Sequence, residues 1–418
     1  MTHIAVIGAG ITGVTTAFQL REQGHDVTLI DRHRYPAMET SYANGGQLSA
    51  CNAEVWNQRA TLLKGLKWMF TPGAPFLLNP RPSWHKLSWL AEFVMAIPRY
   101  RMNTVQTARL AVAARAPLLA MAERAGLAFD LRRQGIMHVV STEAEMVAAR
   151  RVSLLLAEAG VERRELEAGE VRARAPGIDG PIAGGFFTES DMSGDIHLFT
   201  VGLAQWLEST GTVLRLGTRV DGLRPGAEDV RLVLDGEEAR FDGVVIAAGV
   251  ASRALARAAG DRVNVYPVKG YSVTVALEDA ASRAAAPEVS LVDDSAKIVT
   301  SRLGENRLRI AGTAELNGFN RDIRADRIAP LLEWCGRRFP AVRTERAEPW
   351  AGLRPMMPDM MPRVGGGQHP RVFYNTGHGH LGWTLAGATA VAVASAVTEG
   401  LRTQAGRTHP VRAMAQPG

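Results

Sequence analysis

The first 31 residues fit a β-α-β unit around a glycine-rich turn, and this feature limits the possible folds more than any other. Residues 3–7 (HIAVI) are mostly apolar and β-branched, as in a strand buried on both faces of a parallel sheet. They lead into the GxGxxG turn of residues 8–13 and then into a segment with helical spacing that ends at Gly24. Residues 27–30 predict a second strand, which ends at Asp31. The unit therefore predicts a Rossmann-type domain that binds a dinucleotide.

The residue types in this unit have separate roles. Gly8 permits a tight turn, Gly10 lets backbone N–H groups approach a pyrophosphate, and Gly13 lets the helix pack closely on the strand. Asp31 can accept hydrogen bonds from both ribose hydroxyls. An acid at this position disfavours a 2′-phosphate, and therefore NADP, so these residues leave NAD and FAD open.

Three further glycine-bearing segments lie far apart along the chain: 40–49 (TSYANGGQLS), 244–249 (VVIAAG) and 374–384 (YNTGHGHLGWT). The first is small and polar where a single-domain nicotinamide enzyme would normally continue with β-α units. The second is a buried strand that ends in small residues, and the third leads into an apolar helix. We expect the three segments to wrap one long ligand.

Composition narrows the class of protein. The chain has 418 residues, which predicts two or three domains, and no segment approaches the roughly 18 unbroken apolar residues of a membrane span. Its start lacks the pattern of a secretory signal, so we expect a cytoplasmic location. Two distant cysteines exclude a disulfide framework and a multi-cysteine zinc site. The net charge of +6 is modest, and without a basic block with interleaved aromatics we expect no nucleic-acid binding.

Two other classes of enzyme are disfavoured by their missing motifs. The ten histidines form no HxxxH or HExxH arrangement, so we expect no metal. No G-x-S-x-G motif indicates a serine hydrolase.

Six motifs, in the same order over nearly the whole chain, resemble the small-subunit family of bacterial D-amino acid dehydrogenases, within the D-amino acid oxidase and glycine oxidase superfamily. They are GAGITG, SYANGGQLS, YPVKGYSVT (266–274), AGTAELNGFN (311–320), WAGLRPMMPD (350–359) and NTGHGHLGWT (375–384). The resemblance implies bound FAD and oxidative deamination of a D-amino acid, with electrons passed to a membrane carrier or another acceptor.

The resemblance also implies a set of cofactor-binding residues: Gly8, Gly10, Ile11, Thr12, Gly13, Asp31, Arg32, Ser41, Gln47, Leu48, Val220, Ala248, Gly249, Gly377, Gly379, Gly382, Trp383 and Thr384. Within this set, we expect Gln47 and Leu48 beside the isoalloxazine and Val220 near the adenine end. Cys335 lies outside every flavin-facing motif, so we expect the FAD to be held noncovalently.

Three residues are the candidates for catalysis. Arg354 matches the superfamily position that binds the substrate carboxylate, which a guanidinium can hold with two parallel hydrogen bonds. His380 falls where relatives place a side chain near substrate and flavin, and its imidazole could take a proton from the substrate ammonium or bind the amine. The Tyr271 phenol could reach the carboxylate, or the ring could be a core aromatic. For His378 we favour hydrogen bonding to backbone in its glycine loop.

The expected fold class is α/β: an FAD-binding Rossmann-type domain with a D-amino-acid-oxidase-like α+β substrate domain inserted in two segments. The FAD-binding domain is assigned residues 1–55, 161–260 and 345–418, and the substrate domain residues 56–160 and 261–344. The sheet of the substrate domain is expected to contain the strand-like segments 136–140, 271–275, 298–300 and 307–311.

Residues 56–100 are apolar, aromatic and basic at once, with four of the eight tryptophans among prolines and lysines. Such a mixture suits peripheral contact with the inner face of the cytoplasmic membrane. A cap over the second domain is the favoured alternative, because the prolines prevent one continuous amphipathic helix.

Two further functions remain open. His380 stands where this family more often has threonine or a small residue, which keeps a dehydrogenase of a cyclic or secondary amine, such as cis-4-hydroxy-D-proline, in consideration. The chain could also be a flavoprotein subunit that needs a partner.

Overall fold

The N-terminal β-α-β unit forms as the sequence predicts. In the computed structural model, which describes residues 2–68, 71 and 73–408, β1 (His3–Ile7) pairs in parallel with β2 (Asp26–Asp31). Helix α1 (Ile11–Glu22) connects them, and the chain leaves it through Gly24, whose φ is +83°. Glycine reaches this left-handed conformation without a steric penalty, so it suits the point where the helix must turn back to the sheet.

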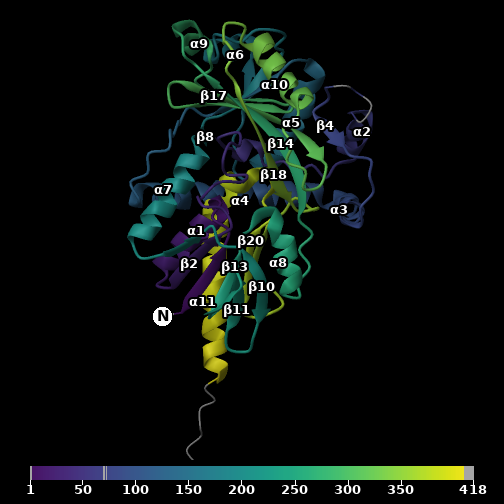
Figure 1. The fold of residues 1–418 in the computed structure, drawn as a ribbon. Coiled ribbons are helices and arrows are strands. Elements are labelled where there is room, and N and C mark those ends of the chain that lie inside the picture. The colour runs from purple at the N-terminus through teal and green to yellow at the C-terminus, as the bar shows by residue number, and fades with distance from the viewer. Residues whose placement is uncertain (1, 69–70, 72, 409–418) are drawn as a thin grey trace, which may run out of the picture.

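This unit is part of a six-stranded sheet in the lower half of Figure 1. Its strands are parallel except for one antiparallel edge strand, β19. Across the sheet they are β19 (Arg363–Gly366), β20 (Val372–Thr376), β13 (Gly243–Ile246), β1, β2 and β9 (Val213–Leu216). Beside it lies an antiparallel meander of β10 (Val220–Pro225), β11 (Val230–Leu234) and β12 (Glu237–Phe241).

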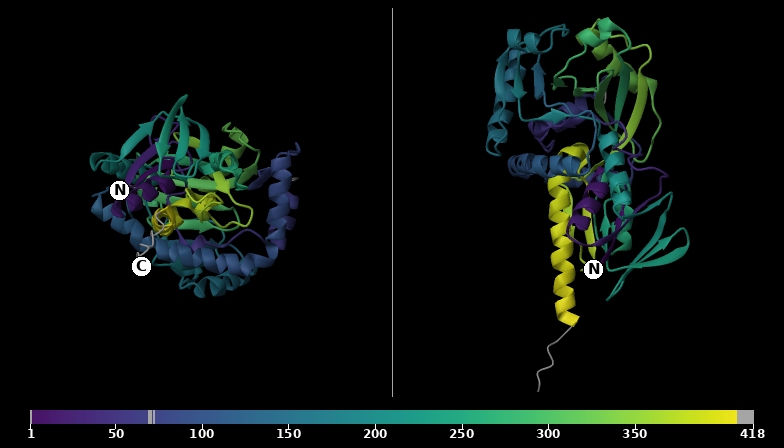
Figure 2. Two further views of the ribbon diagram at one scale, coloured as in Figure 1. Left: turned by 90° about the horizontal axis from the view of Figure 1, so that it is seen from below. Right: turned by 90° about the vertical axis from the view of Figure 1, so that its left-hand side faces the viewer.

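Helices cover this first sheet and fill its core. They are α1, α7 (Ile196–Ser209), α8 (Ser252–Ala258), α11 (Gly382–Thr408) and the end of α4 (Tyr100–Arg124). One apolar stretch, Gly379–Gln404, is long and apolar enough to cross a membrane by length and composition, but 61% of its most apolar window is buried. It packs against α1 and α4, as Figure 2 shows, so core packing accounts for its apolar face.

The second sheet has nine strands and lies in the upper half of Figure 1. Its path runs through β18 (Glu348–Met356), β14 (Tyr266–Ala276), β17 (Arg307–Leu316), β16 (Ile298–Leu303), β15 (Ser290–Asp293), β5 (Ile136–Val140), β7 (Gly184–Thr188) and β6 (Arg164–Glu167), with β4 (Phe76–Leu78) on β17. Helices α5 (Glu143–Ala157), α6 (Ala168–Arg174), α9 (Ala280–Ala285) and α10 (Ala325–Arg338) accompany it. The four segments predicted to share this sheet all do so, because each alternates or concentrates apolar residues at strand length.

Three strands of this sheet come from segments that the predicted boundaries place in the FAD-binding domain: β6, β7 and β18. Antiparallel pairing joins β7 to β5 and β18 to β14. Such long-range pairing cannot be read from the local pattern of either strand. The domain boundaries themselves stay a prediction, and residues 409–418 at the end of the last segment lie outside the described residues.

The Trp-rich segment 56–100 breaks into α2 (Arg59–Trp68), β4 and α3 (Trp84–Met95), in keeping with its prolines; residues 69–70 and 72 lie outside the described part. Trp89 is buried and donates a hydrogen bond from its indole to the Met356 carbonyl, at 2.9 Å. Trp84 on the other face of α3 is 82% exposed. One face of α3 therefore caps the second domain and the other faces solvent.

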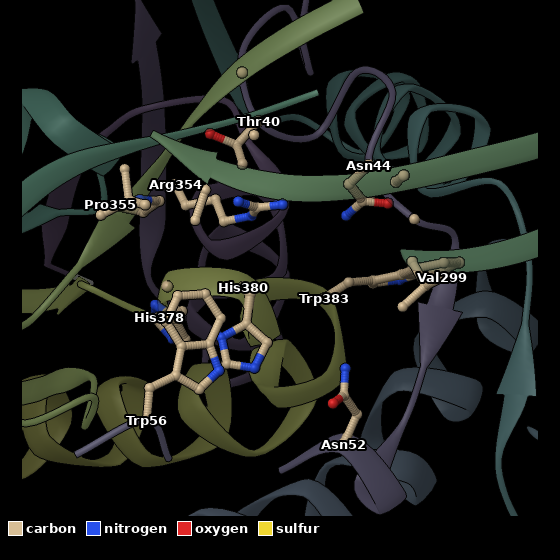
Figure 3. A pocket seen from close by; sticks show the side chains of 18 of the residues that line it. Thr40, Asn44, Asn52, Trp56, Val299, Arg354, Pro355, His378, His380 and Trp383 are labelled. Atoms are coloured by element: carbon tan, nitrogen blue, oxygen red, sulfur yellow. The ribbon is translucent and has the colours of Figure 1, made fainter. Parts of the chain in front are cut away.

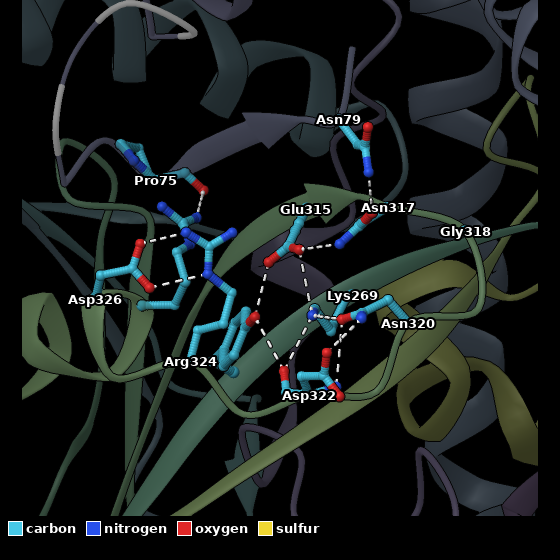
Figure 4. Close-up of polar contacts among 12 residues, drawn as sticks. Pro75, Asn79, Lys269, Glu315, Asn317, Gly318, Asn320, Asp322, Arg324 and Asp326 are labelled. Carbon is cyan, nitrogen blue, oxygen red and sulfur yellow. Dashed lines mark hydrogen bonds and ion pairs between the residues drawn. The ribbon is translucent and has the colours of Figure 1, made fainter. Parts of the chain in front are cut away.

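A charged cluster is buried between β14, β17 and the loop of residues 317–322 (Figure 4). Lys269 and Glu315 form an ion pair of 3.2 Å, and both side chains are fully buried. Tyr271 donates a hydrogen bond to Glu315 at 2.7 Å, and Lys269 donates one to Asn320 at 2.6 Å. Burial raises the pKa of Glu315, but the hydrogen bonds and the lysine charge outweigh it, so the pKa is lowered. Neither charge is left alone in the core.

We expect Glu315→Leu to lower the free energy of unfolding by about 3–5 kcal/mol, because it leaves the buried ammonium unpaired. The double variant Lys269→Met/Glu315→Leu removes both charges and should lose much less. Urea denaturation followed by tryptophan fluorescence measures both values. Equal losses in the single and double variants would contradict this account.

Candidate active site

A cavity of about 1480 Å³ lies between the two sheets and reaches from the glycine turn after β1 to Arg354 and His380. Typical small-molecule sites have roughly 300–1,000 Å³. The cavity can therefore hold a dinucleotide and still leave room for a small substrate. Figure 3 shows its inner end, where Arg354, His380 and Trp56 come together.

The glycine turn is shaped by contacts that exclude side chains. Gly8 has φ +112°, and a Cβ there would lie 2.5 Å from the Ala247 carbonyl oxygen. A Cβ on Gly13 would lie 1.7 Å from the Gly8 carbonyl oxygen, so Gly13 serves the packing of α1 and does not line the cavity. Gly10, Ile11 and Thr12 do line it. The turn thus brings main-chain N–H groups at the start of α1 to the cavity, where they suit a pyrophosphate.

Asp31 also lines the cavity, at the end of β2. Its two carboxylate oxygens accept hydrogen bonds from the backbone N–H of Ala9, at 2.7 Å, and of His33, at 2.8 Å. A carboxylate has about four acceptor positions, so two remain for ribose hydroxyls. Arg32 lies in the same wall, paired with Glu39.

The segment 40–49 lies between the two sheets and is hydrogen-bonded to the second one. Ser272, Ser301 and Arg309 donate to the carbonyls of residues 43–45, at 2.6 to 3.0 Å. Ser41 accepts from the Ile11 N–H at 3.0 Å, and Gln47 donates to Ser290 at 2.8 Å. These bonds hold the segment against both domains, where it forms one wall of the cavity.

Most of the predicted cofactor-binding residues line this cavity, including Val220, Ala248, Gly249, Gly377, Gly379, Gly382 and Trp383. Leu48 and Thr384 do not, because Leu48 packs in the core and the Thr384 hydroxyl accepts from the Ser49 N–H at 3.1 Å. The Trp383 indole nitrogen is buried and has no hydrogen-bond partner among the described residues. A glycine cradle and an unpaired indole N–H fit a flavin dinucleotide.

Arg354 is held at the inner end by neutral acceptors. Its guanidinium donates to the carbonyl of Thr313 at 2.7 Å and to that of Gly312 at 3.5 Å. Among the described residues no carboxylate pairs with it. Burial lowers the pKa of Arg354 to about 10, so the side chain remains cationic at neutral pH. A buried cation without a counter-ion is a strong binding site for a carboxylate.

The position of this guanidinium depends on Gly270, which lies beside Arg354 on the neighbouring strand β14. A Cβ on Gly270 would lie 2.3 Å from the guanidinium carbon of Arg354. The glycine therefore provides the space that the arginine head occupies, a role that its place in the KGYS motif does not reveal.

His380 lines the same end of the cavity as Arg354 (Figure 3). Its ring stacks on Trp56, with ring centroids 4.8 Å apart and planes at 21°. A backbone hydrogen bond with Asn52 raises the pKa of His380, but burial and then the charge of Arg354 outweigh it and lower the pKa to about 4. The ring is therefore neutral at pH 7, and its nitrogens have no side-chain partner among the described residues.

Two other predicted side chains, Tyr271 and His378, are hydrogen-bonded to protein side chains. Tyr271 is among the residues that line the cavity, but its hydroxyl donates to Glu315 and its ring packs in the core of the second sheet. This placement agrees with the core alternative for Tyr271. The His378 ring is hydrogen-bonded to the Thr389 hydroxyl at 3.0 Å, not to backbone. In both cases the tertiary structure determines the hydrogen-bond partner, because the partner is not adjacent in the sequence.

The wall contains residues that the motifs did not single out. Trp56, Asn52 and Cys51 come from the chain after β3 (Gln47–Leu48), and Thr313 and Val299 come from the second sheet. Cys51 is buried, with its sulfur 3.3 Å from His138. Two of them had a signal in the sequence: Trp56 is the first tryptophan of the Trp-rich segment, and Thr313 lies in the motif at 311–320. The other three are ordinary residue types that only the fold brings to the cavity.

Two solved enzyme structures superpose on nearly the whole chain. Glycine oxidase from Geobacillus kaustophilus superposes with a TM-score of 0.74 at 22% identity, covering 96% of this chain and 95% of its own. L-proline dehydrogenase from P. horikoshii superposes with a TM-score of 0.73 at 17% identity, covering 96% and 94%. At these identities the likeness shows the fold, which confirms the expected α/β class.

Curated relatives are closer in sequence. D-amino acid dehydrogenase 3 of Mesorhizobium japonicum is 53% identical over 404 residues, which cover 96% of this chain and 98% of the relative. D-amino acid dehydrogenase of Paramagnetospirillum magneticum is 39% identical over 394 residues, covering 91% and 92%. The profile of the FAD dependent oxidoreductase family, DAO, matches residues 3–396. This protein therefore belongs to the DAO family of FAD-dependent oxidoreductases.

Proposed function

We propose that this protein is a D-amino acid dehydrogenase, which oxidises the amine carbon of a D-amino acid to an imine that hydrolyses to a 2-oxo acid and ammonia. The observation that carries the proposal is the partly buried guanidinium of Arg354, which has no carboxylate partner among the described residues and lies in the cavity wall beside His380. The names of the relatives at 53% and 39% identity support the same substrate class.

Arg354 supplies binding and orientation. Its donors to Thr313 and Gly312 leave the rest of the planar fork for the substrate carboxylate, and two parallel bonds fix the direction of the amino acid. When bound, FAD supplies the acceptor for the hydride equivalent that leaves the substrate carbon. Holding that carbon at the right distance and angle accounts for much of the rate.

His380 suits hydrogen bonding better than proton transfer. The substrate arrives mostly as an ammonium, and hydride loss requires the neutral amine. With a pKa near 4, the imidazole is a weak proton acceptor at pH 7, although a ring nitrogen can still hydrogen-bond the amine. We expect the proton to pass to water.

The stacked pair of Trp56 and His380 favours a second candidate substrate. The two rings form a flat aromatic wall beside Arg354, which suits the ring of a cyclic amino acid. A dehydrogenase of a cyclic or secondary amine such as cis-4-hydroxy-D-proline would use the same carboxylate site.

The outer face of α3 suggests where the protein meets its electron acceptor. Trp84, Leu87, Val94 and Met95 are exposed along one side of the helix, and Trp84 and Met95 are 82% and 76% exposed. Exposed cations occur in and beside the same segment of the sequence, at Lys64, Arg81 and Arg99. An exposed apolar stripe in a basic segment suits the surface of an anionic membrane that carries a quinone-type acceptor. The cytoplasmic location, peripheral on the inner face of the membrane, stays a prediction.

A panel of substrates with an artificial dye as acceptor tests the activity. We expect dye reduction with D-alanine and other D-amino acids, and turnover with cis-4-hydroxy-D-proline alone would identify the second candidate. Arg354→Ala should raise KM by about 100-fold or more, because it removes hydrogen bonds to a charged group. If no member of the panel reduces the dye, the proposed dehydrogenase activity is contradicted. The alternative that the chain is a flavoprotein subunit that needs a partner would then be favoured.

Two glycine variants test the placement of Arg354. Gly270→Ala would put a Cβ 2.3 Å from the guanidinium carbon and should raise KM while the FAD content stays the same. Gly65→Ala is the matched control, because its Cβ would lie 3.8 Å from the Phe76 ring, an ordinary contact. Equal KM values for the two variants would count against the placement.

Stability should depend on pH through His380. Its pKa is about 4 in the folded protein and about 6.5 when exposed, so the unfolded chain binds more protons between these values. The free energy of unfolding should therefore fall as the pH drops from 6.5 to 4, by up to about 3 kcal/mol from this residue. Urea unfolding at pH 7 and pH 5 should show a smaller fall for His380→Gln, and an identical fall would argue against a buried neutral ring.

Flotation with vesicles of anionic phospholipid at low salt tests the membrane contact. Wild-type protein should float with the vesicles, and the double variant Trp84→Ser/Met95→Ser should stay in the soluble fraction. Leu154→Ser on α5 is the control, since Leu154 is 70% exposed but lies away from α3. If the wild type does not float, the membrane contact is refuted.

A further inference from the structure

Strand β17 contains a bulge beside Arg354. Against β14, Tyr271 is opposite Gly312 and Lys269 is opposite Glu315, so β17 has one extra residue between these pairs. At the same place β17 changes its other neighbour, from β16 at Gly312 to β4 at Ala314. A bulge re-aims the backbone and side chain of its extra residue, and such bulges are frequent next to active sites.

Thr313 lies in this bulge with φ +61°. Six non-glycine residues of the described chain have positive φ, and Thr313 is the β-branched one among them. For a β-branched residue this conformation is strained, because the side chain crowds the backbone. The surrounding sheet holds it in place, since Thr313 is only 5% exposed.

The strained backbone directs the Thr313 carbonyl at Arg354. The carbonyl oxygen accepts from the guanidinium at 2.7 Å, and the Gly312 carbonyl lies within 3.5 Å of the second nitrogen. In a regular strand, carbonyls point at the neighbouring strands within the sheet. The bulge therefore provides two neutral acceptors that fix the guanidinium without cancelling its charge.

The Thr313 hydroxyl is unpaired within the described part of the chain. Its oxygen is buried, and no hydrogen-bond partner exists for it among the described residues. Thr313 is also part of the cavity wall, beside Arg354. A buried hydroxyl without a partner lowers stability unless a ligand satisfies it.

We propose that Thr313 is a second carboxylate-binding residue of this site: its left-handed backbone positions Arg354, and its hydroxyl donates a hydrogen bond to the same carboxylate. The proposal rests on the function proposed above. If Thr313 were only a structural residue of the strand, its hydroxyl would have no part in substrate binding.

The test compares Thr313→Val with Thr313→Ser in the flavin-bound protein. Valine keeps the branched shape and removes the hydroxyl, whereas serine keeps the hydroxyl. We expect valine to raise KM for the D-amino acid, and the Kd of its 2-oxo acid product, by about tenfold to 100-fold, the effect of losing one hydrogen bond to a charged group. Serine should stay within about twofold of wild type. The change in the flavin absorption band on adding the 2-oxo acid measures Kd independently of turnover.

Thermal unfolding separates this role from a structural one. Valine replaces an unpaired buried hydroxyl with a methyl group, so Thr313→Val should melt no lower than wild type although it binds more weakly. Thr313→Gly removes the strain as well and should also melt no lower, while binding more weakly.

Two results would overturn the proposal. One is a valine variant that binds the amino acid and the 2-oxo acid as wild type does, and the other is a serine variant that binds as weakly as valine. Failure of the proposed function gives a different result, because then the wild-type protein itself turns over no D-amino acid.

Discussion

The organisation of the active site depends on one partly buried charge. Arg354 is cationic, partly buried and without a carboxylate partner among the described residues. Burying such a group is unfavourable unless hydrogen bonds satisfy it, and here main-chain carbonyls from the bulge do so. Gly270 leaves the space for its head. Because these acceptors are neutral, the charge stays available for a carboxylate ligand.

The same charge affects its neighbours across the cavity. His380 is kept neutral by burial and by the positive guanidinium, so the site presents one permanent cation beside an uncharged ring. A cation beside a neutral ring favours a ligand that carries its negative charge at one end, as an amino acid does. Lys269 on β14 and Glu315 on β17 form a buried ion pair in the second sheet. Their opposite charges cancel, so the pair stabilises the sheet and adds no net charge to the cavity.

Segment 40–49 connects the two halves of the site. It leaves the nucleotide-binding domain after β2, yet side chains from the second sheet donate to its carbonyls. A connecting loop between the domains needs such bonds, because its backbone groups would otherwise be buried without partners. The loop thus fixes the distance between the glycine turn and Arg354.

Local sequence patterns were enough to predict the β-α-β unit, its glycine turn, Asp31 and four strands of the second sheet, because each depends on residues close together in the chain. Motif likeness placed Arg354 and His380 in one site. The fold alone decided that Tyr271 binds Glu315, that Leu48 and Thr384 pack beside the cavity, and that Trp56 and Thr313 line it. Those outcomes depend on strand pairing and burial between distant segments, where many partners are compatible with the same local pattern.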